Sequence, residues 1–167
     1  NNAIFGNTPR AVELGELGMS LFDKLGAKKH WAQAYYIYNV GITVWKESLD
    51  IVNDYLYDAY EVASANGDFE YMMSASAARA HYLFRAGKEL SDLIQETEKM
   101  KKSILPVYDK ITSSQFDVLL QLFTNFVDEK DKPEQLNGSY YNEQEMIAYH
   151  QKDQDDTSLM MIYLDKL

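Results

Sequence analysis

The sequence contains no cysteine, few proline and glycine residues, and no long apolar run. The absence of cysteine excludes disulfide bonds, thiolate metal sites and a cysteine nucleophile. No apolar stretch approaches the roughly 18 residues of a membrane-spanning helix, so we expect no membrane insertion. Basic residues are also outnumbered, because 16 Lys and Arg stand against 26 Asp and Glu and leave a net charge of -10. An acidic chain repels phosphate groups, so we expect neither nucleic acid nor an anionic membrane surface as a partner.

Apolar and helix-forming residues are abundant. Hydrophobic residues make up 46% of the 167 residues, which is enough apolar side chain to exclude disorder throughout the chain. Only 8 Gly and 3 Pro interrupt the sequence, and no segment sustains the strict alternation of apolar and polar residues that strands show. The composition therefore predicts an all-α protein.

Turn residues divide the chain into helices. Gly26 is predicted to end the first helix as a left-handed cap, and Gly67 and Gly87 to end two later helices. Pro106 predicts a break in the chain before a helix that starts near Ile111. The residues predicted to cap helix starts are Thr8, Ser48, Asp68, Asn142 and Asp156.

Polar stretches suggest the organisation of the chain. Residues 1–8 are interpreted as a lead-in or the remnant of a tag, and 9–127 as helical-hairpin repeats. Residues 128–141 are predicted to form a polar loop, and 142–167 a further helical hairpin that is truncated at its C-terminus. We expect the apolar face of this hairpin either to self-associate or to pack back on the preceding helices. Its residues are Leu159, Ile162, Tyr163 and Leu167.

Helical features recur with a period of roughly 41 residues. Gly67 follows Gly26 by 41 residues, and Lys88 follows Lys46 by 42 residues. Two helices per period of this length are typical of helix-hairpin solenoids. The sequence therefore predicts antiparallel helix hairpins stacked as a right-handed superhelix, an α-solenoid similar to tetratricopeptide (TPR) repeats. The second unit matches the small, large apolar and glycine positions of that repeat with Ala80, Leu83 and Gly87.

Residues that could carry catalysis are scattered. His30, His81 and His150 each lack a second histidine three or four residues away, so no helical metal pair is predicted. The acidic runs at 128–131 and 153–156 are expected to cap helices and keep the surface polar, because the second run lacks the glycine and glutamate of a calcium loop. Phosphate-binding loops and the signatures of serine hydrolases and kinases are absent from the sequence. We therefore expect no catalytic residue, metal or cofactor, and no enzymatic activity from this chain alone.

Two stripes of large residues run along the predicted helices near the N-terminus. The first is a row of leucines at spacings of three and four, formed by Leu14, Leu17, Leu21 and Leu25. The second is aromatic and includes Trp31, Tyr35, Tyr38 and Trp45. We expect Trp31 and Trp45 to be structural residues, with Trp45 buried where two helices of a hairpin converge.

The aromatic stripe allows two interpretations. In a helical solenoid one helix of each pair lines the concave face, where tyrosines can bind a peptide or a small ligand. Alternatively, most of these rings pack between hairpins, with their hydroxyls reaching solvent or backbone groups. Tyr36 and Tyr57 lie off the apolar stripes and are expected to be the most exposed, whereas His81 has the alternative of a structural, hydrogen-bonded role. The candidate groove residues are Tyr35, Tyr36, Asn39, Tyr57 and His81.

Several segments together resemble one known group of proteins. These segments are Trp45–Leu49, Ala59–Tyr60, Gly67–Tyr71, Gly87–Leu90, Tyr141–Met146 and Tyr163–Leu167. In their order and spacing they resemble the TPR-like helical-repeat region of very large bacterial multidomain signalling proteins. Those proteins combine a serine/threonine-kinase-like domain, an AAA-type ATPase domain, the helical repeats, a GAF sensor and often a histidine kinase.

The resemblance implies a function that involves no catalysis. It implies a non-catalytic, cytoplasmic interaction and relay module of a signal-transduction kinase and ATPase, which contacts a protein partner or the flanking domains of the same polypeptide. The alternative is a helical domain that senses a small ligand with an aromatic concave groove. The resemblance carries over no catalytic residue, because the kinase, ATPase and GAF motifs lie outside this chain.

Overall fold

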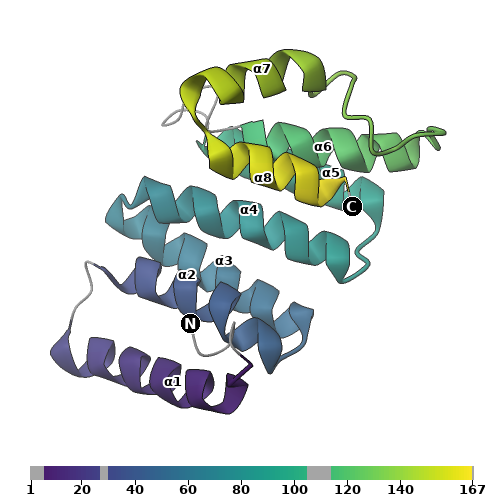
Figure 1. Cartoon of the computed structure of the whole chain (residues 1–167). Helices are drawn as coiled ribbons and strands as arrows, with labels where there is room; N and C mark the ends of the chain where they lie inside the picture. The colour runs from purple at the N-terminus through teal and green to yellow at the C-terminus, as the bar shows by residue number, and fades with distance from the viewer. Residues whose placement is uncertain (1–5, 27–29, 105–113, 167) are drawn as a thin grey trace. The chain divides into compact units, whose positions relative to one another are not determined.

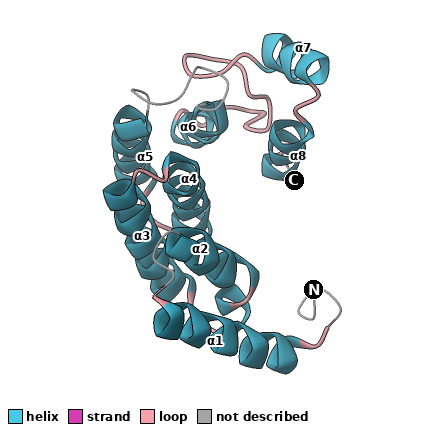
Figure 2. Cartoon of the chain, turned by 90° about the vertical axis from the view of Figure 1, so that its left-hand side faces the viewer, coloured by secondary structure: helices cyan, strands magenta, loops and turns pink. Residues whose placement is uncertain are grey.

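The structure is a computed structural model that describes residues 6–26, 30–104 and 114–166. These residues form eight α-helices and one short 3-10 helix, and they contain no β-strand beyond an isolated bridge between Asn137 and Asn142. The prediction of an all-α protein is confirmed for these parts of the chain (Figure 2). The predicted break at Pro106 and the helix start at Ile111 lie outside the described residues.

The chain forms two compact units, Asn1–Gly87 and Lys88–Leu167, and the boundary between them in the sequence follows Gly87, one of the predicted helix-ending glycines. Unit 1 contains α1 (Thr8–Leu25), α2 (Trp31–Gly41), the 3-10 helix η2 (Thr43–Trp45), α3 (Leu49–Asn66) and α4 (Phe69–Arg85). Unit 2 contains α5 (Leu90–Ile104), α6 (Ser114–Val127), α7 (Glu143–Asp153) and α8 (Asp156–Asp165) (Figure 1).

Helix ends in unit 1 follow the predicted capping residues closely. The side chains of Ser48 and Asp68 each accept a backbone N–H from the first turn of α3 and α4. Gly26 and Gly67 end α1 and α3 with φ angles of 60° and 68°, and Gly87 follows α4 with a φ of 80°. A left-handed backbone of this kind strains any residue with a Cβ, which explains the three glycines.

Two helix starts lie one residue earlier than predicted. Asn7 caps α1 and Asp155 caps α8, each by accepting the backbone N–H three residues further along the chain. Thr8 and Asp156 are therefore the first residues of their helices rather than the caps.

Helices α3 and α4 form the centre of unit 1. They are joined by the short turn at Gly67–Asp68, lie side by side (Figure 1), and α2 packs against both of them. Their buried sides carry mainly small residues, which allow helix axes to approach closely. These residues include Ala59, Ala63, Ala75, Ala77 and Ala80.

The leucine stripe of α1 does not face the rest of unit 1. Instead α1 packs on α2 through its small residues: Ala11 is buried, and Gly15 lies directly against the ring of Tyr38. The small residues on this side let the two helices approach, and the leucines are turned outward. Four leucines are 43% to 77% exposed, namely Leu14, Leu17, Leu21 and Leu25.

Trp45 is 65% exposed, so the prediction that it is buried is wrong. Helix α2 ends at Gly41, and Trp45 belongs to the separate 3-10 helix η2. A 3-10 helix has three residues per turn rather than 3.6, so the phase of the aromatic stripe changes between Tyr38 and Trp45. Treating residues 31–45 as one continuous α-helix therefore assigned Trp45 to the wrong face.

Helix α6 is the central helix of unit 2, and it is buried on nearly every side. Helices α5 and α8 pack against it, while α7 packs on α8. The core of this unit draws residues from α5, α6, α8 and the loop after α6, each no more than 1% exposed. These residues are Leu93, Ile104, Phe116, Leu119, Leu120, Phe123, Leu136 and Ile162.

The apolar face predicted for the final hairpin is divided in the structure. Ile162 is 1% exposed, so this residue packs back on the preceding helices, which was one of the two predicted outcomes. Tyr163 is 53% exposed, and Met160 and Leu164 are exposed beside it at helical spacing. Leu167 lies outside the described residues. Helix α8 therefore keeps a small apolar patch, formed by Met160, Tyr163 and Leu164.

The loop 128–141 contains no helix, as predicted, but buried side-chain amides hold it in place. The carbonyl of the Gln121 side chain accepts the backbone N–H groups of Tyr140 and Tyr141 at 3.0 and 3.3 Å. The amide nitrogen of Gln121 donates to Oδ1 of Asn125 at 2.8 Å. Gln121 and Asn125 are both 0% exposed, so α6 fixes the loop from inside the core of unit 2.

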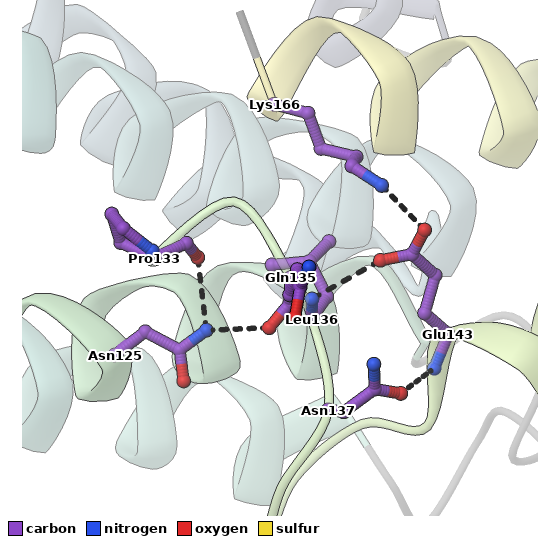
Figure 3. Close-up of polar contacts among 7 residues, drawn as sticks. All are labelled: Asn125, Pro133, Gln135, Leu136, Asn137, Glu143 and Lys166. Carbon is purple, nitrogen blue, oxygen red and sulfur yellow. Dashed lines mark hydrogen bonds and ion pairs between the residues drawn. The ribbon is translucent and has the colours of Figure 1, made fainter. Parts of the chain in front are cut away.

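Further hydrogen bonds from Asn125 and Glu143 hold the loop (Figure 3). The side-chain nitrogen of Asn125 donates to two loop carbonyls, each at 2.9 Å. The Glu143 carboxylate accepts the backbone N–H of Leu136 at 3.1 Å and pairs with Lys166, and the Glu143 N–H is bound by Oδ1 of Asn137 at 3.1 Å. Side chains of α6 and α7 thus bind backbone groups of the loop at residues 133, 135, 136, 140 and 141.

Candidate ligand-binding groove

A cavity of about 290 Å³ opens between α1, α2, η2 and α3 of unit 1. We call it the aromatic groove, after the four rings that line it. It contains Tyr35 and Asn39 from the predicted groove, together with Trp31, which was predicted to be structural. The four rings are those of Trp31, Tyr35, Tyr38 and Tyr55.

Contacts among the rings fix the walls of the aromatic groove. Trp31 and Tyr35 stack with their ring centroids 4.3 Å apart, and Tyr55 of α3 meets Tyr35 edge-on at 6.0 Å. The residues on α2 share one side of the helix because they are spaced by four and three positions. A Cβ atom at Gly15 would lie 2.5 Å from Cε2 of Tyr38, so the glycine of α1 makes room for the fourth ring.

Two buried polar side chains line the groove without complete hydrogen bonding. Nδ2 of Asn39 donates to the backbone carbonyl of Tyr35 at 2.9 Å, but Oδ1 of Asn39 has no partner in the described part of the chain. Oγ1 of Thr43 has none there either. The two residues are 0% and 2% exposed. A buried polar atom without a partner costs about 1–3 kcal/mol, so these two atoms reduce the stability of unit 1.

Among the described residues that line the groove, carboxylates outnumber cations. Asp23 and Glu47 line it, and Lys46 is the cation among its lining residues. Nζ of Lys46 lies 3.0 Å from Oε1 of Glu16 and 3.9 Å from Oε1 of Glu47, so its charge is already matched. The hydrogen bond to Glu16 is the main reason that the pKa of Lys46 is raised. These described lining residues therefore carry a net negative charge.

Tyr35 also lines this groove, and the pKa of its hydroxyl is shifted. Burial, followed by the nearby Asp58 carboxylate, raises the pKa of the Tyr35 hydroxyl to about 12. Tyr35 therefore stays protonated at neutral pH and adds no further charge.

The structure places Tyr36, Tyr57 and His81 outside the residues that line this groove. Tyr36 is partly buried rather than open to solvent, and its ring lies 5.8 Å from that of Tyr71. Burial raises the pKa of Tyr36. Tyr57 is 49% exposed, as expected, and its ring lies 5.5 Å from the guanidinium carbon of Arg79. Tyr36 and Tyr57 therefore lie on the sides of α2 and α3 that face α4.

His81 is a core residue of α4. It is 8% exposed, and burial, with a smaller contribution from Arg85, lowers its pKa to about 4. The ring is therefore neutral at physiological pH and behaves as a packed, structural side chain, in line with the second of the two interpretations of this residue.

A second buried histidine joins two helices of unit 2. Nδ1 of His150 in α7 lies 3.0 Å from Oδ2 of Asp155, the residue that caps α8. Burial of Asp155 acts to raise its pKa, but hydrogen bonds from Ser158 and the interaction with His150 outweigh this and lower it. The pair fixes the turn between α7 and α8.

Sequence reasoning missed several residues of the aromatic groove. Tyr38 could have been found from its spacing to Tyr35, since both lie on the aromatic stripe. Met19 and Asp23 come from α1 and Tyr55 from α3, and their position depends on how these helices pack, for which the sequence holds no local signal.

No protein-family model matches the chain, and comparisons with curated proteins and with solved structures found no match. Within the described ranges, no cluster of three or more His, Cys, Asp or Glu side chains is placed to hold a metal ion. None of the helices in these ranges combines the length and the apolar character needed to cross a membrane. Function is therefore inferred from the surfaces and cavities of the two units.

Proposed function

We propose that the chain is a non-catalytic helical-repeat interaction and relay module of a cytoplasmic, multidomain bacterial signal-transduction kinase and ATPase. The observation that supports this function best is the exposed leucine stripe of α1, whose four members are 43% to 77% exposed. Exposed apolar side chains in a continuous row are typical of surfaces that bind another element. The resemblance of the sequence to signalling proteins supports the remaining part of the proposal.

The arrangement that goes with this function is a TPR-like right-handed superhelix. Within unit 1 the hairpin of α3 and α4 and the packing of α2 on both helices are consistent with repeat packing, in which each hairpin contacts its neighbours. The occupant that we propose for the leucine stripe is an amphipathic helix, which presents apolar residues at the same spacing of three and four. Such a helix would come from a partner protein or from a flanking domain of the same polypeptide.

The leucine stripe can be tested by placing charges on it. The double variant Leu17→Glu/Leu21→Glu should still fold, because both side chains are exposed, yet it should weaken binding of the flanking domains by at least about tenfold, since burying a charge is costly. The double variant Ser64→Glu/Ala65→Glu adds the same charge at exposed positions of α3 and serves as the control. The flanking domains are taken from the parent reading frame, and binding is measured by isothermal titration calorimetry. Equal affinity of the two variants would contradict the proposal.

The relay function needs a separate measurement. In the full-length protein, Leu17→Glu/Leu21→Glu should change the rate of ATP hydrolysis or autophosphorylation, whereas the α3 control variant should not. The exposed patch on α8 suggests self-association as an additional contact of the module. Sedimentation of the chain and of the variant Tyr163→Glu measures that contact.

A second candidate function is the sensing of a small ligand in the aromatic groove. The observation that favours it is a cavity of about 290 Å³ lined by four aromatic rings, with Asn39 and Thr43 among its lining residues. Ligand pockets combine mainly apolar walls with a few polar groups in this way. A thermal-shift screen with small metabolites tests it, because a ligand that binds only the folded state raises stability. An Asn39→Leu variant should lose the shift.

A further inference from the structure

We propose that the leucine stripe of α1 packs against the leucine stripe of a second copy of this chain, with the two helices antiparallel about a two-fold axis near Leu17 and Gly18. The proposal rests on the proposed function above, because it names the helix that occupies this interaction surface. Three features of α1 point to this partner: the order of its leucines, the glycine beside them and the charges on one flank.

The leucines of α1 match one another when the helix is reversed. With an axis between Leu17 and Gly18, Leu14 of each copy lies level with Leu21 of the other, and the two Leu17 side chains meet near the axis. A two-fold contact of this kind buries the same surface on both copies. Antiparallel helices also place the positive end of one helix dipole beside the negative end of the other.

Gly18 gives two helices room to approach. It lies four residues after Leu14 and three before Leu21, so it belongs to the same side of α1. An added Cβ at Gly18 would meet no atom within 4 Å in the described part of the chain, whereas one at Gly15 would meet Tyr38. Packing inside unit 1 therefore explains Gly15 but not Gly18. A glycine weakens a helix but lets a neighbouring helix come close, and the second copy supplies that neighbour.

The charges on one flank of the stripe select the antiparallel direction. Glu13 and Lys24 are both exposed, and they lie on the same flank because eleven residues make three helical turns. In an antiparallel pair this flank faces the same flank of the other copy. Glu13 then lies about 3 Å along the helix axis from Lys24 of the other copy, within reach of an ion pair. A parallel pair would set this flank against the opposite one, which carries Gly18 and Phe22 instead.

The other charges of α1 do not oppose this contact. Arg10 lies level with Leu25 of the other copy, where its aliphatic stem can cover the leucine, and its guanidinium lies 2.9 Å from Glu13 of its own chain. Glu16 and Asp23 lie on the far side of the helix: the first pairs with Lys46 and the second lines the aromatic groove. Like charges therefore do not meet between the two copies of α1.

Sedimentation of the whole chain measures the dimer. One helix per copy gives a small interface, so we expect a weak dimer that forms between about 10 and 500 μM. Leu17→Glu/Leu21→Glu should weaken dimerisation at least about tenfold, because it brings charges into the contact. The α3 control Ser64→Glu/Ala65→Glu and the α8 variant Tyr163→Glu should dimerise like the unchanged chain, and circular dichroism checks that all three variants are folded.

Charge reversal tests the antiparallel direction and leaves every leucine in place. Glu13→Lys alone and Lys24→Glu alone each set like charges against one another between the copies, so each variant should dimerise more weakly than the unchanged chain. An equimolar mixture of the two variants restores opposite charges at both contacts. The mixed dimer should therefore be about threefold or more tighter than either variant's own dimer, and the gain should disappear in 1 M salt.

The absence of cysteine permits a crosslinking test. In an antiparallel pair Gly18→Cys lies near the axis and should form a disulfide-linked dimer on oxidation. Leu25→Cys lies about 20 Å along the axis from its copy and should remain unlinked under the same conditions. Equal crosslinking of the two variants would indicate a parallel or unspecific contact and would contradict the proposal.

The outcomes separate this inference from the proposed function. A chain that stays monomeric at 500 μM would overturn the inference, as would a dimer that the leucine variant leaves unchanged or a mixture of charge variants no tighter than its components. If the chain is monomeric but the flanking domains bind the leucine stripe, the interaction function stands and the second copy is not its partner. If neither binds, both proposals are wrong.

Discussion

Gly15 and Gly18 lie three residues apart in α1, and replacing each with alanine should change the stability of unit 1 in different ways. Alanine is more favourable than glycine inside a helix by about 0.8–1.0 kcal/mol. At Gly18 no atom lies within 4 Å of the added Cβ, so the variant should show this full gain. If unit 1 unfolds as one body, about 1 kcal/mol corresponds to an increase of about 4–8 °C in Tm.

At Gly15 the same methyl group meets the neighbouring helix. Its Cβ would lie 2.5 and 2.7 Å from two ring carbons of Tyr38 and 2.8 Å from Cδ1 of Ile42. Distances this short force the side chains or the helix to move, at a cost of about 1–3 kcal/mol. After the helix gain is subtracted, Gly15→Ala should be neutral to about 2 kcal/mol destabilising, and it should differ from Gly18→Ala by about 1–3 kcal/mol.

Thermal and urea denaturation followed by circular dichroism measures both variants. Binding gives a second measurement, because Tyr38 also lines the aromatic groove and Gly18 is not among its lining residues. A displaced ring should weaken ligand binding in Gly15→Ala while Gly18→Ala binds normally. An equal stabilisation by both alanines would refute the packing of α1 on α2 described here.

Further predictions follow from individual side chains. Trp45→Ala should change the free energy of unfolding by only about 0.5 kcal/mol because Trp45 is 65% exposed, whereas Leu56→Ala at a fully buried site should cost about 2–5 kcal/mol; urea denaturation compares the two. Gly138→Ala should destabilise unit 2 by about 1–3 kcal/mol, since its Cβ would lie 2.5 Å from Nε2 of the buried Gln121, and hydrogen exchange of loop 128–141 should increase. Burial lowers the pKa of His81 to about 4, so the unfolded chain takes up its proton first as the pH falls from 6.5. The free energy of unfolding should therefore fall by about 3 kcal/mol as the pH is lowered from 6.5 towards 4, and His81→Leu should flatten the pH dependence of Tm over this range.

Local sequence signals predicted the helices well but not which side of each helix is buried. The caps at Ser48 and Asp68 and the glycine at position 67 predicted α3 and α4, because capping depends on residues close in sequence. The leucine stripe of α1 was equally regular, yet the helix packs through Gly15 and Ala11. Periodicity identifies an apolar face, but whether that face meets its own unit or another surface depends on the partner helix.

The residues of the aromatic groove were also only partly predictable from the sequence. Tyr35 and Asn39 were singled out because they are four residues apart on one helix, and the structure places them together. Tyr36 and Tyr57 were added on the assumption of one concave face, but they lie against α4. Trp45 was misplaced because the apolar spacing continues past Gly41, although Gly41 and Thr43 are residue types that often stand where one helix ends and another begins.

The way α6 holds the loop 128–141 predicts how this segment can diverge during evolution. Gln121 and Asn125 bind backbone groups, which every amino acid provides except that proline lacks the N–H, so the identity of most loop residues is free to drift. The number of residues between the held points is not free, because an insertion would move those carbonyl and N–H groups out of register. Relatives of this protein should therefore retain both amides and the spacing from residue 133 to 141, while insertions and deletions should accumulate in the exposed stretch at 128–132.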